Sequence, residues 1–280
     1  MKSSASPHGR ARPDRAGILV VSFGTSVPEA RRAIDNLVDS AKEAFPEAQV
    51  RLAFTSNIIR RKIAREQNVG IPTPAEALAR MQDEGITRVC VMPTHIIPGE
   101  EYDDIRSVVD AFASIRGKYG FRRIALGSPY LHSVPDCDRM AEILAARFGR
   151  RLEDEGTAIV LMGHGTPTHS ANAMYCQLQL ALDRIADGRF FIGTVEAAPT
   201  IEDVVRGLKK HPSVGRLVLS PLMIVSGDHA NNDMAGPDDD SWLHRLRREG
   251  YENVEPHLVG LGEDPRMAEV FVERIREMLL

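Results

Sequence analysis

A histidine held between two glycines ends an apolar run in "VLMGHGTPTH", residues 160–169. A neutral imidazole can take up a proton near pH 7, and it is also a common ligand of transition metals. The neighbouring Gly163 and Gly165 would let a ligand or another backbone segment approach His164 closely. A structural histidine held by a hydrogen bond is the alternative, and His164 alone leaves both interpretations open.

Two further residues occupy comparable places after later apolar segments. Glu196 follows "FFIGTV", and His229 follows "SPLMIVSGD". Two imidazoles and one carboxylate, with coordination positions left open, suit a divalent first-row metal such as cobalt, iron, nickel or zinc. Each residue also has an ordinary alternative: a salt bridge to an arginine for Glu196, and a polar loop that caps the next segment for His229.

The segments that would hold these residues alternate between strands and helices. Continuous apolar runs, typical of parallel strands buried on both faces, are followed by stretches with helical spacing. The expected strands are 17–23, 49–56, 86–96, 123–131, 157–166, 190–199 and 215–225. The expected helices are 28–45, 73–85, 101–115, 169–186, 201–211 and 264–280. This order predicts parallel sheets covered by helices.

The second half of the chain repeats the first, with a period of roughly 130 residues that indicates a duplicated domain. The segment "VVSFGTS" matches "LMGHGTP", and "RVCVMPTHIIPGEEY" matches "RLVLSPLMIVSGDHA". We therefore predict an α/β fold of two similar domains, each a parallel β-sheet flanked by helices, with the active site in the cleft between them. The expected parts are a disordered tail (1–16), a first domain (17–140) and a second domain (141–280), with the C-terminal helix free to pack back on the first domain.

The repeat also pairs individual residues of the two halves. The pairs are Phe23 with His164, Glu101 with His229, and Thr55 with Glu196. Neighbouring strands of a sheet lie about 5 Å apart, so three side chains at the strand ends of the second half can converge on one point. Since the first half ends the equivalent strand in an apolar residue, the fold itself does not require a histidine there.

Composition and motifs exclude several classes of function. The 280 residues are 43% hydrophobic and 26% charged, with a net charge of -4, as in an ordinary globular protein without a general preference for nucleic acid or membrane. Three separated cysteines indicate neither a disulfide framework nor a zinc knuckle. Without an apolar leader before Ile18, we expect a cytoplasmic protein. The chain lacks a phosphate-binding loop and a dinucleotide fingerprint, so neither a nucleotide nor a redox cofactor is expected.

Five motifs together resemble the CbiK-type anaerobic cobalt chelatases, which are sirohydrochlorin cobaltochelatases. They are "SFGTS", "THIIPGEEYDDI", "MGHGTPTHSANAMY", "VEAAPTIEDV" and "PLMIVSGDHANNDMAG". The resemblance implies a fold similar to that of class II ferrochelatases. It also implies insertion of Co²⁺ into sirohydrochlorin, for cobalamin biosynthesis, and allows insertion of Fe²⁺ to give sirohaem. By the same resemblance, His164 is the proton-accepting residue and a metal ligand, and Glu196 and His229 are the other metal ligands.

A polycarboxylate tetrapyrrole needs cations and polar groups around its binding site. Arg60, in a run with Arg61 and Lys62, is one candidate, although such a run is also typical of a solvated helix face. His95 and Glu101, near a strand end of the first half, are further candidates together with Phe23. A histidine packed in the core is the alternative for His95.

Two other functions stay open at this point. A histidine phosphotransferase or phosphatase also carries a His-Gly pair after its first strand, but Gly163 stands where such enzymes have a phosphate-binding arginine. A metal or tetrapyrrole carrier without catalytic activity would use the same three ligands. The sequence does not specify whether the chain forms a homo-oligomer.

Overall fold

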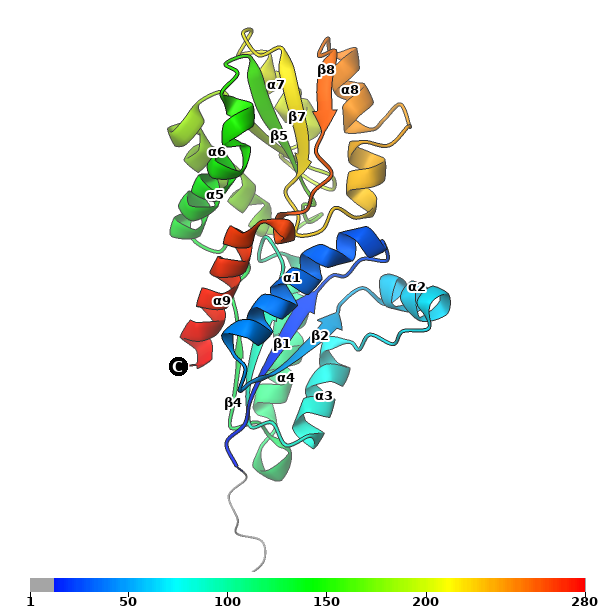
Figure 1. Ribbon diagram of the computed structural model, residues 1–280, viewed down its shortest axis with the longest axis vertical. Helices are drawn as coiled ribbons and strands as arrows, with labels where there is room; N and C mark the ends of the chain where they lie inside the picture. Colours follow the sequence, from blue (N-terminus) through cyan, green and yellow to red (C-terminus); the bar gives the residue numbers. More distant parts are fainter. Residues whose placement is uncertain (1–12, 280) are drawn as a thin grey trace, which may run out of the picture.

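The computed structural model describes residues 13–279, which form two halves that each contain a four-stranded parallel sheet (Figure 1). The strand order is β2-β1-β3-β4 in the first sheet and β6-β5-β7-β8 in the second. The strands are β1 (Ala16–Ser22), β2 (Gln49–Phe54), β3 (Arg88–Pro93), β4 (Arg123–Leu126), β5 (Thr157–Gly163), β6 (Phe190–Thr194), β7 (Arg216–Pro221) and β8 (Asn253–Pro256). The predicted α/β fold of two similar parallel sheets is confirmed.

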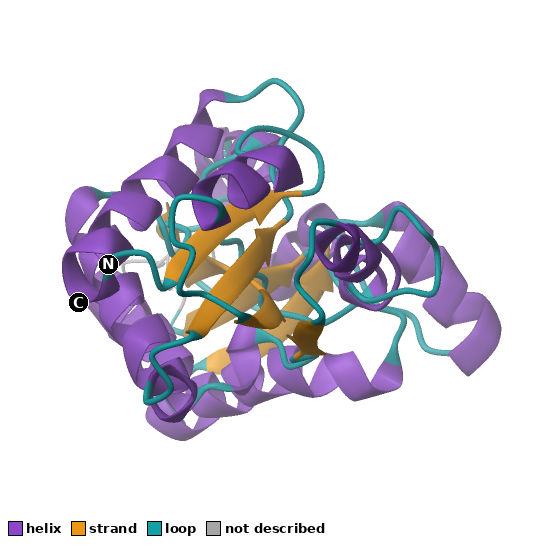
Figure 2. Ribbon diagram, turned by 90° about the horizontal axis from the view of Figure 1, so that it is seen from above, coloured by secondary structure: helices purple, strands orange, loops and turns teal. Residues whose placement is uncertain are grey.

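Helices cover both faces of each sheet, and the strands are enclosed by them (Figure 2). The helices are α1 (Pro28–Ala44), α2 (Asn57–Gln67), α3 (Pro74–Asp83), α4 (Glu100–Ser114), α5 (Val134–Leu152), α6 (Ala173–Ala186), α7 (Ile201–Leu208), α8 (Trp242–Arg248) and α9 (Pro265–Leu279). Short 3-10 turns occupy Gly117–Tyr119, Ser170–Asn172 and Leu261–Glu263, and Ala230–Met234 is a π-helical turn. No helix within residues 13–279 is long and apolar enough to cross a lipid bilayer.

The central strands β1 and β5 explain the continuous apolar runs of the sequence. Every residue of β5 is buried, as is every residue of β1 after Ala16. In the first half, α1 and α9 pack on one face of the sheet and α3 and α4 on the other. In the second half, α5 and α6 cover one face and α7 and α8 the other. A strand covered on both faces gains stability from nearly all its side chains, about 1.5–3 kcal/mol for each large apolar one.

The chain crosses between the halves twice. After β4 it enters α5, which packs against α6 in the second half, and after β8 it returns to α9, which packs against α1 and β3 in the first half (Figure 1). The helix Val134–Leu152 thus begins before the expected boundary at residue 140 but lies with the second half. The last helix lies on the first half.

The structure contains three helices and one strand that the sequence analysis did not predict: α2, α5, α8 and β8. Only Ile63 is fully buried in α2, so this helix lacks the apolar stripe that marks the others. α8 and β8 are short, with seven and four residues. The long helix α5 has ordinary helical spacing of its apolar residues and was predictable.

The expected tail, residues 1–16, lies mostly outside the described residues. In the described part of this segment, the Thr87 amide donates to the Arg15 carbonyl, and the Arg15 amide donates to Oγ1 of Thr87, both at 2.9 Å. Asp14 forms an ion pair with Arg88 at 3.1 Å. Ala16 already belongs to β1. Ordered structure therefore begins before residue 17.

Candidate functional site

Backbone hydrogen bonds beyond the last strand residues bring Glu196 beside His164. The Val195 amide donates to the Gly163 carbonyl at 3.0 Å, and the Glu196 amide donates to the His164 carbonyl at 3.0 Å. The carboxylate Oε2 of Glu196 lies 3.7 Å from His164 Nδ1. Glu196 has no ion pair with an arginine among residues 13–279, so the salt-bridge alternative for this residue does not apply.

His229 joins this pair from the loop after β7, at the start of the π-helical turn. Its ring centroid lies 4.8 Å from that of His164, and the two rings meet edge to face at 80°. Its side chain makes no capping hydrogen bond to the turn, contrary to the alternative of a capping loop. The side chains of His164, Glu196 and His229 are 34%, 37% and 35% exposed, so a dissolved ligand can reach all three.

The hydrogen bonds of the two histidines define which ring nitrogen is free. His164 Nδ1 lies 2.9 Å from the Gly165 carbonyl, and His229 Nδ1 lies 2.6 Å from Oδ2 of Asp233. A carbonyl and a carboxylate can only accept, so Nδ1 carries the hydrogen in both rings. Each Nε2 then presents a free lone pair, the usual arrangement of a metal-binding or proton-accepting histidine. Asp233 was not among the predicted site residues, although its i,i+4 spacing from His229 on a turn was a usable signal.

The glycines beside His164 make room for protein atoms. A Cβ on Gly163 would lie 2.7 Å from the ring of Tyr175, and Gly165 has a φ of +83° and faces Thr194 at 2.8 Å. Tyr175 is buried, which raises the pKa of its hydroxyl to about 12, and this hydroxyl accepts a hydrogen bond from the Gly165 amide at 3.4 Å. Of the two expected uses of these glycines, the structure shows the close approach of protein atoms, which for Gly165 include the Ala197 backbone amide.

Phe23 reaches the same region from the first half. Its ring centroid lies 6.3 Å from that of His164, and the residue is 39% exposed. His95 and Glu101 form a pair on the first half, with Nε2 3.3 Å from Oε2. The buried Nδ1 of His95 has no hydrogen-bond partner among the described residues. Phe23 and His164 thus come together. Within residues 13–279, the His95–Glu101 pair forms no hydrogen bond, ion pair or ring contact with His164.

The Arg60 guanidinium is bound by residues of the first half. Its Nε donates to the Ile71 carbonyl at 2.7 Å, and its Nη2 donates to Oε2 of Glu76 at 2.8 Å. These contacts tie α2 to the start of α3 and leave little of the guanidinium for a substrate. Its exposed neighbours Arg61 and Lys62 form no ion pair among the described residues.

The backbone corrects one residue pair of the repeat. In the first half the Ser56 amide donates to the Phe23 carbonyl at 3.2 Å. In the second half the Glu196 amide makes the same hydrogen bond to the His164 carbonyl. The residue equivalent to Glu196 is therefore Ser56, and Thr55 is one position away.

The three predicted ligands do not enclose a metal position as the side chains stand. Within residues 13–279, no group of three or more His, Cys, Asp or Glu side chains is arranged to hold a metal ion. The His164 nitrogen that lies 3.7 Å from the Glu196 carboxylate is Nδ1, which is already hydrogen-bonded to the Gly165 carbonyl.

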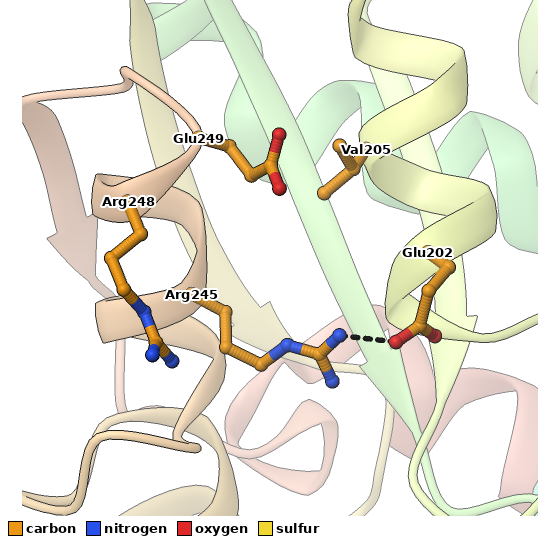
Figure 3. Close-up of a pocket in the computed structure, with 5 residues that line it drawn as sticks. All are labelled: Glu202, Val205, Arg245, Arg248 and Glu249. Atoms are coloured by element: carbon orange, nitrogen blue, oxygen red, sulfur yellow. Dashed lines mark hydrogen bonds and ion pairs between the residues drawn. The ribbon is translucent and has the colours of Figure 1, made fainter.

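Two pockets lie elsewhere, on the outer side of the second half. One, of about 440 Å³, lies between α7 and α8 and is lined by Glu202, Val205, Arg245, Arg248 and Glu249 (Figure 3). The Arg245 guanidinium is hydrogen-bonded to Glu202 and lowers the pKa of that carboxyl to about 2. The other pocket lies between α6 and α7. Neither is lined by a predicted site residue.

Comparisons with known proteins agree with the fold and the motifs. A family model described as cobalt chelatase (CbiK) matches residues 16–279. The chain is 33% identical over 271 residues to the sirohydrochlorin cobaltochelatase of Salmonella typhimurium, covering 95% of this chain and 97% of the relative. It is 34% identical over 274 residues to the sirohydrochlorin cobaltochelatase of Nitratidesulfovibrio vulgaris, covering 97% and 93%.

Two solved structures have a similar fold at low sequence identity. SirB from Bacillus subtilis with Fe³⁺ superposes with a TM-score of 0.63 at 16% identity, covering 94% of this chain and 95% of SirB. CbiX, described as the terminal enzyme of sirohaem biosynthesis in denitrifying bacteria, superposes with a TM-score of 0.57 at 19% identity, covering 94% and 100%. At this identity, the likeness shows the shared two-sheet fold.

Proposed function

Because the chain belongs to the cobalt chelatase (CbiK) family, we propose that it is a chelatase that inserts Co²⁺ into the tetrapyrrole sirohydrochlorin. The observation that carries this proposal is the name shared by two relatives that match nearly the full chain at 33% and 34% identity, sirohydrochlorin cobaltochelatase. The convergence of His164, Glu196 and His229 where the two halves face each other supports it.

The reaction needs a base and a weakly held metal at the same place. A free-base tetrapyrrole loses two pyrrole N–H protons as a dication enters, so the charge of the macrocycle complex is conserved. The metal must also exchange its water and protein ligands for four pyrrole nitrogens. Two imidazoles and one carboxylate leave coordination positions open, which permits that exchange.

Each of the three residues has a role that follows from its hydrogen bonds. Nε2 of His164 has the free lone pair and takes the two pyrrole protons one after the other, releasing the first to water before it takes the second. Its Nδ1–H remains hydrogen-bonded to the Gly165 carbonyl throughout. Before it takes a proton, the same Nε2 binds the incoming Co²⁺ together with Nε2 of His229 and the carboxylate of Glu196. Phe23, opposite His164, supplies an apolar surface for the macrocycle. His95 and Glu101 are proposed to contact the substrate from the first half.

The proposal is tested by the rate of metallation. Purified protein with excess sirohydrochlorin and Co²⁺, without oxygen, should convert the free-base absorption spectrum to that of the metallated product over many turnovers. The variant His164→Ala should lose most of this rate, because general-base catalysis typically contributes about 100- to 10,000-fold. His132→Ala, which removes an exposed histidine of the first crossing, should keep it. Binding of both substrates without turnover would instead identify a carrier.

We extend the proposal to Fe²⁺ as a second metal. Imidazole and carboxylate ligands suit Fe²⁺ as well as Co²⁺, and the ligand set alone does not discriminate between them. Competition between the two ions under anaerobic conditions, with the products separated by chromatography, measures the preference. Absence of the iron product at saturating Fe²⁺ would refute this extension and leave the cobalt activity unaffected.

A further inference from the structure

A direct contact joins the two halves beside the proposed site. Thr168 Oγ1 donates to Oε1 of Glu100 at 2.8 Å, and His169 Nε2 lies 3.2 Å from Oδ2 of Asp103. Thr168 and His169 belong to the loop that follows β5, whereas Glu100 and Asp103 belong to the first turn of α4. We call these two side-chain pairs the clasp.

Internal hydrogen bonds give the second-half side of the clasp a defined shape. Asn172 Oδ1 accepts from the Thr166 amide at 3.1 Å, and Asn172 Nδ2 donates to the Thr166 carbonyl at 2.7 Å. His169 Nδ1 accepts from the Ala171 amide at 3.0 Å, so this nitrogen carries no hydrogen. The hydrogen of the neutral ring is then on Nε2, which donates it to Asp103. The clasp therefore forms without protonation of the histidine.

The backbone at Gly99 also approaches the side chain of Thr166 closely beside the clasp. A Cβ placed on Gly99, the residue before α4, would lie 3.3 Å from Cβ of the buried Thr166. Thr166 follows His164 by two residues, and Gly99 precedes Glu101 by two. The clasp thus fixes the distance between the loop that carries the proposed base and the helix turn that carries a proposed substrate contact.

We propose that Thr168, His169, Glu100 and Asp103 are positioning residues for metallation, because they hold the His164 loop in register with the first turn of α4. This inference rests on the proposed chelatase function. All three proposed metal ligands come from the second half, whereas the macrocycle contacts both halves. Loss of the clasp should therefore leave metal binding intact and reduce the rate of insertion.

The test compares Asp103→Ala/Thr168→Ala with the wild-type chain. We expect kcat for Co²⁺ insertion to fall about 10- to 100-fold, since a misplacement of about 1 Å can cost on the order of 100-fold. The affinity for Co²⁺ alone should not change. Asp103→Asn should retain most of the rate, because the amide oxygen still accepts from the neutral imidazole. Arg106→Gln is the matched control: Arg106 is the other ion-pair partner of Asp103, at 3.6 Å, and its loss leaves the clasp in place.

Two results would overturn the inference. One is a wild-type kcat in the double variant, and the other is an equal loss of rate in Asp103→Asn and in the double variant. If the double variant has a lowered midpoint of thermal unfolding, the single change Thr168→Val at an exposed position gives the same comparison without that complication. Failure of the wild-type protein to metallate sirohydrochlorin would refute the proposed function instead.

Discussion

The hydrogen bond between His229 and Asp233 should set the affinity of the site for Co²⁺. At 2.6 Å, the carboxylate of Asp233 holds the Nδ1–H of the ring and so fixes the orientation and the tautomer in which Nε2, the proposed metal-binding atom, carries the lone pair. Loss of such a partner typically weakens metal binding about 10- to 100-fold, which is about 1.4–2.8 kcal/mol. The side chains are 35% and 45% exposed, so solvent screens the pair and the expected effect of Asp233→Ala lies near tenfold.

Calorimetric titration of the variant with Co²⁺ under anaerobic conditions measures this affinity. The matched control is Asp228→Ala, which removes an equal charge one residue before His229. The Asp228 carboxylate accepts from Nδ2 of Asn232 at 2.9 Å, and within residues 13–279 it forms no hydrogen bond or ion pair with the imidazole. Asp233→Asn retains an acceptor oxygen, and its affinity should lie between those of Asp233→Ala and the wild type.

The reasoning about His229 would be refuted by either of two outcomes. Unchanged Co²⁺ affinity in Asp233→Ala would show that Nε2 of this histidine is not a ligand or that its orientation does not depend on the carboxylate. Equal weakening in Asp233→Ala and Asp228→Ala would show that only the loss of negative charge matters.

Three further predictions concern packing, substrate contacts and pH. Gly163→Ala should destabilise the protein by about 1–3 kcal/mol, seen as a lower thermal midpoint, because the new methyl meets the buried ring of Tyr175 at 2.7 Å. Arg60→Gln should leave KM for sirohydrochlorin unchanged, since its guanidinium is already bound within the first half; a raised KM would contradict this. Burial and then the charge of Arg147 lower the pKa of His257 below its ordinary value of 6.5. Below that pH the unfolded chain takes up a proton on this histidine that the folded chain does not, so the free energy of unfolding should fall as the pH decreases. The variant His257→Gln should flatten that part of the curve of unfolding free energy against pH.

The fold was largely predictable because its signals are local. The runs that became β1 and β5 are long and apolar, as required of strands covered on both faces. Helix α2 was missed for the opposite reason, since a helix with one fully buried residue has almost no periodic pattern to recognise. The crossing of α5 to the second half depends on packing between distant segments, which a single sequence does not encode locally.

The candidate site was predictable to a different extent at each residue. His164 and Glu196 each follow a strand of the same sheet, and the predicted order of strands already implied that these strand ends lie close together. The orientation of Arg60 was not predictable, because its acceptors, the Ile71 carbonyl and Glu76, come from the start of another helix and the loop before it. The clasp joins a loop and a helix separated by more than sixty residues in sequence, and no spacing rule pairs them.

The duplication separates what the fold requires beside His164 from what chemistry requires. Gly24 and Gly165 occupy equivalent positions, with φ values of +103° and +83°, and a Cβ on Gly24 would meet the ring of Phe54 at 2.5 Å. Both halves therefore need a glycine after the strand, because the backbone turns into the left-handed region against a packed neighbour. The preceding residue is not constrained in this way, since it is Phe23 in one half and His164 in the other. The imidazole occupies a position that the fold leaves free, which is the expected place for a residue selected for its reactivity.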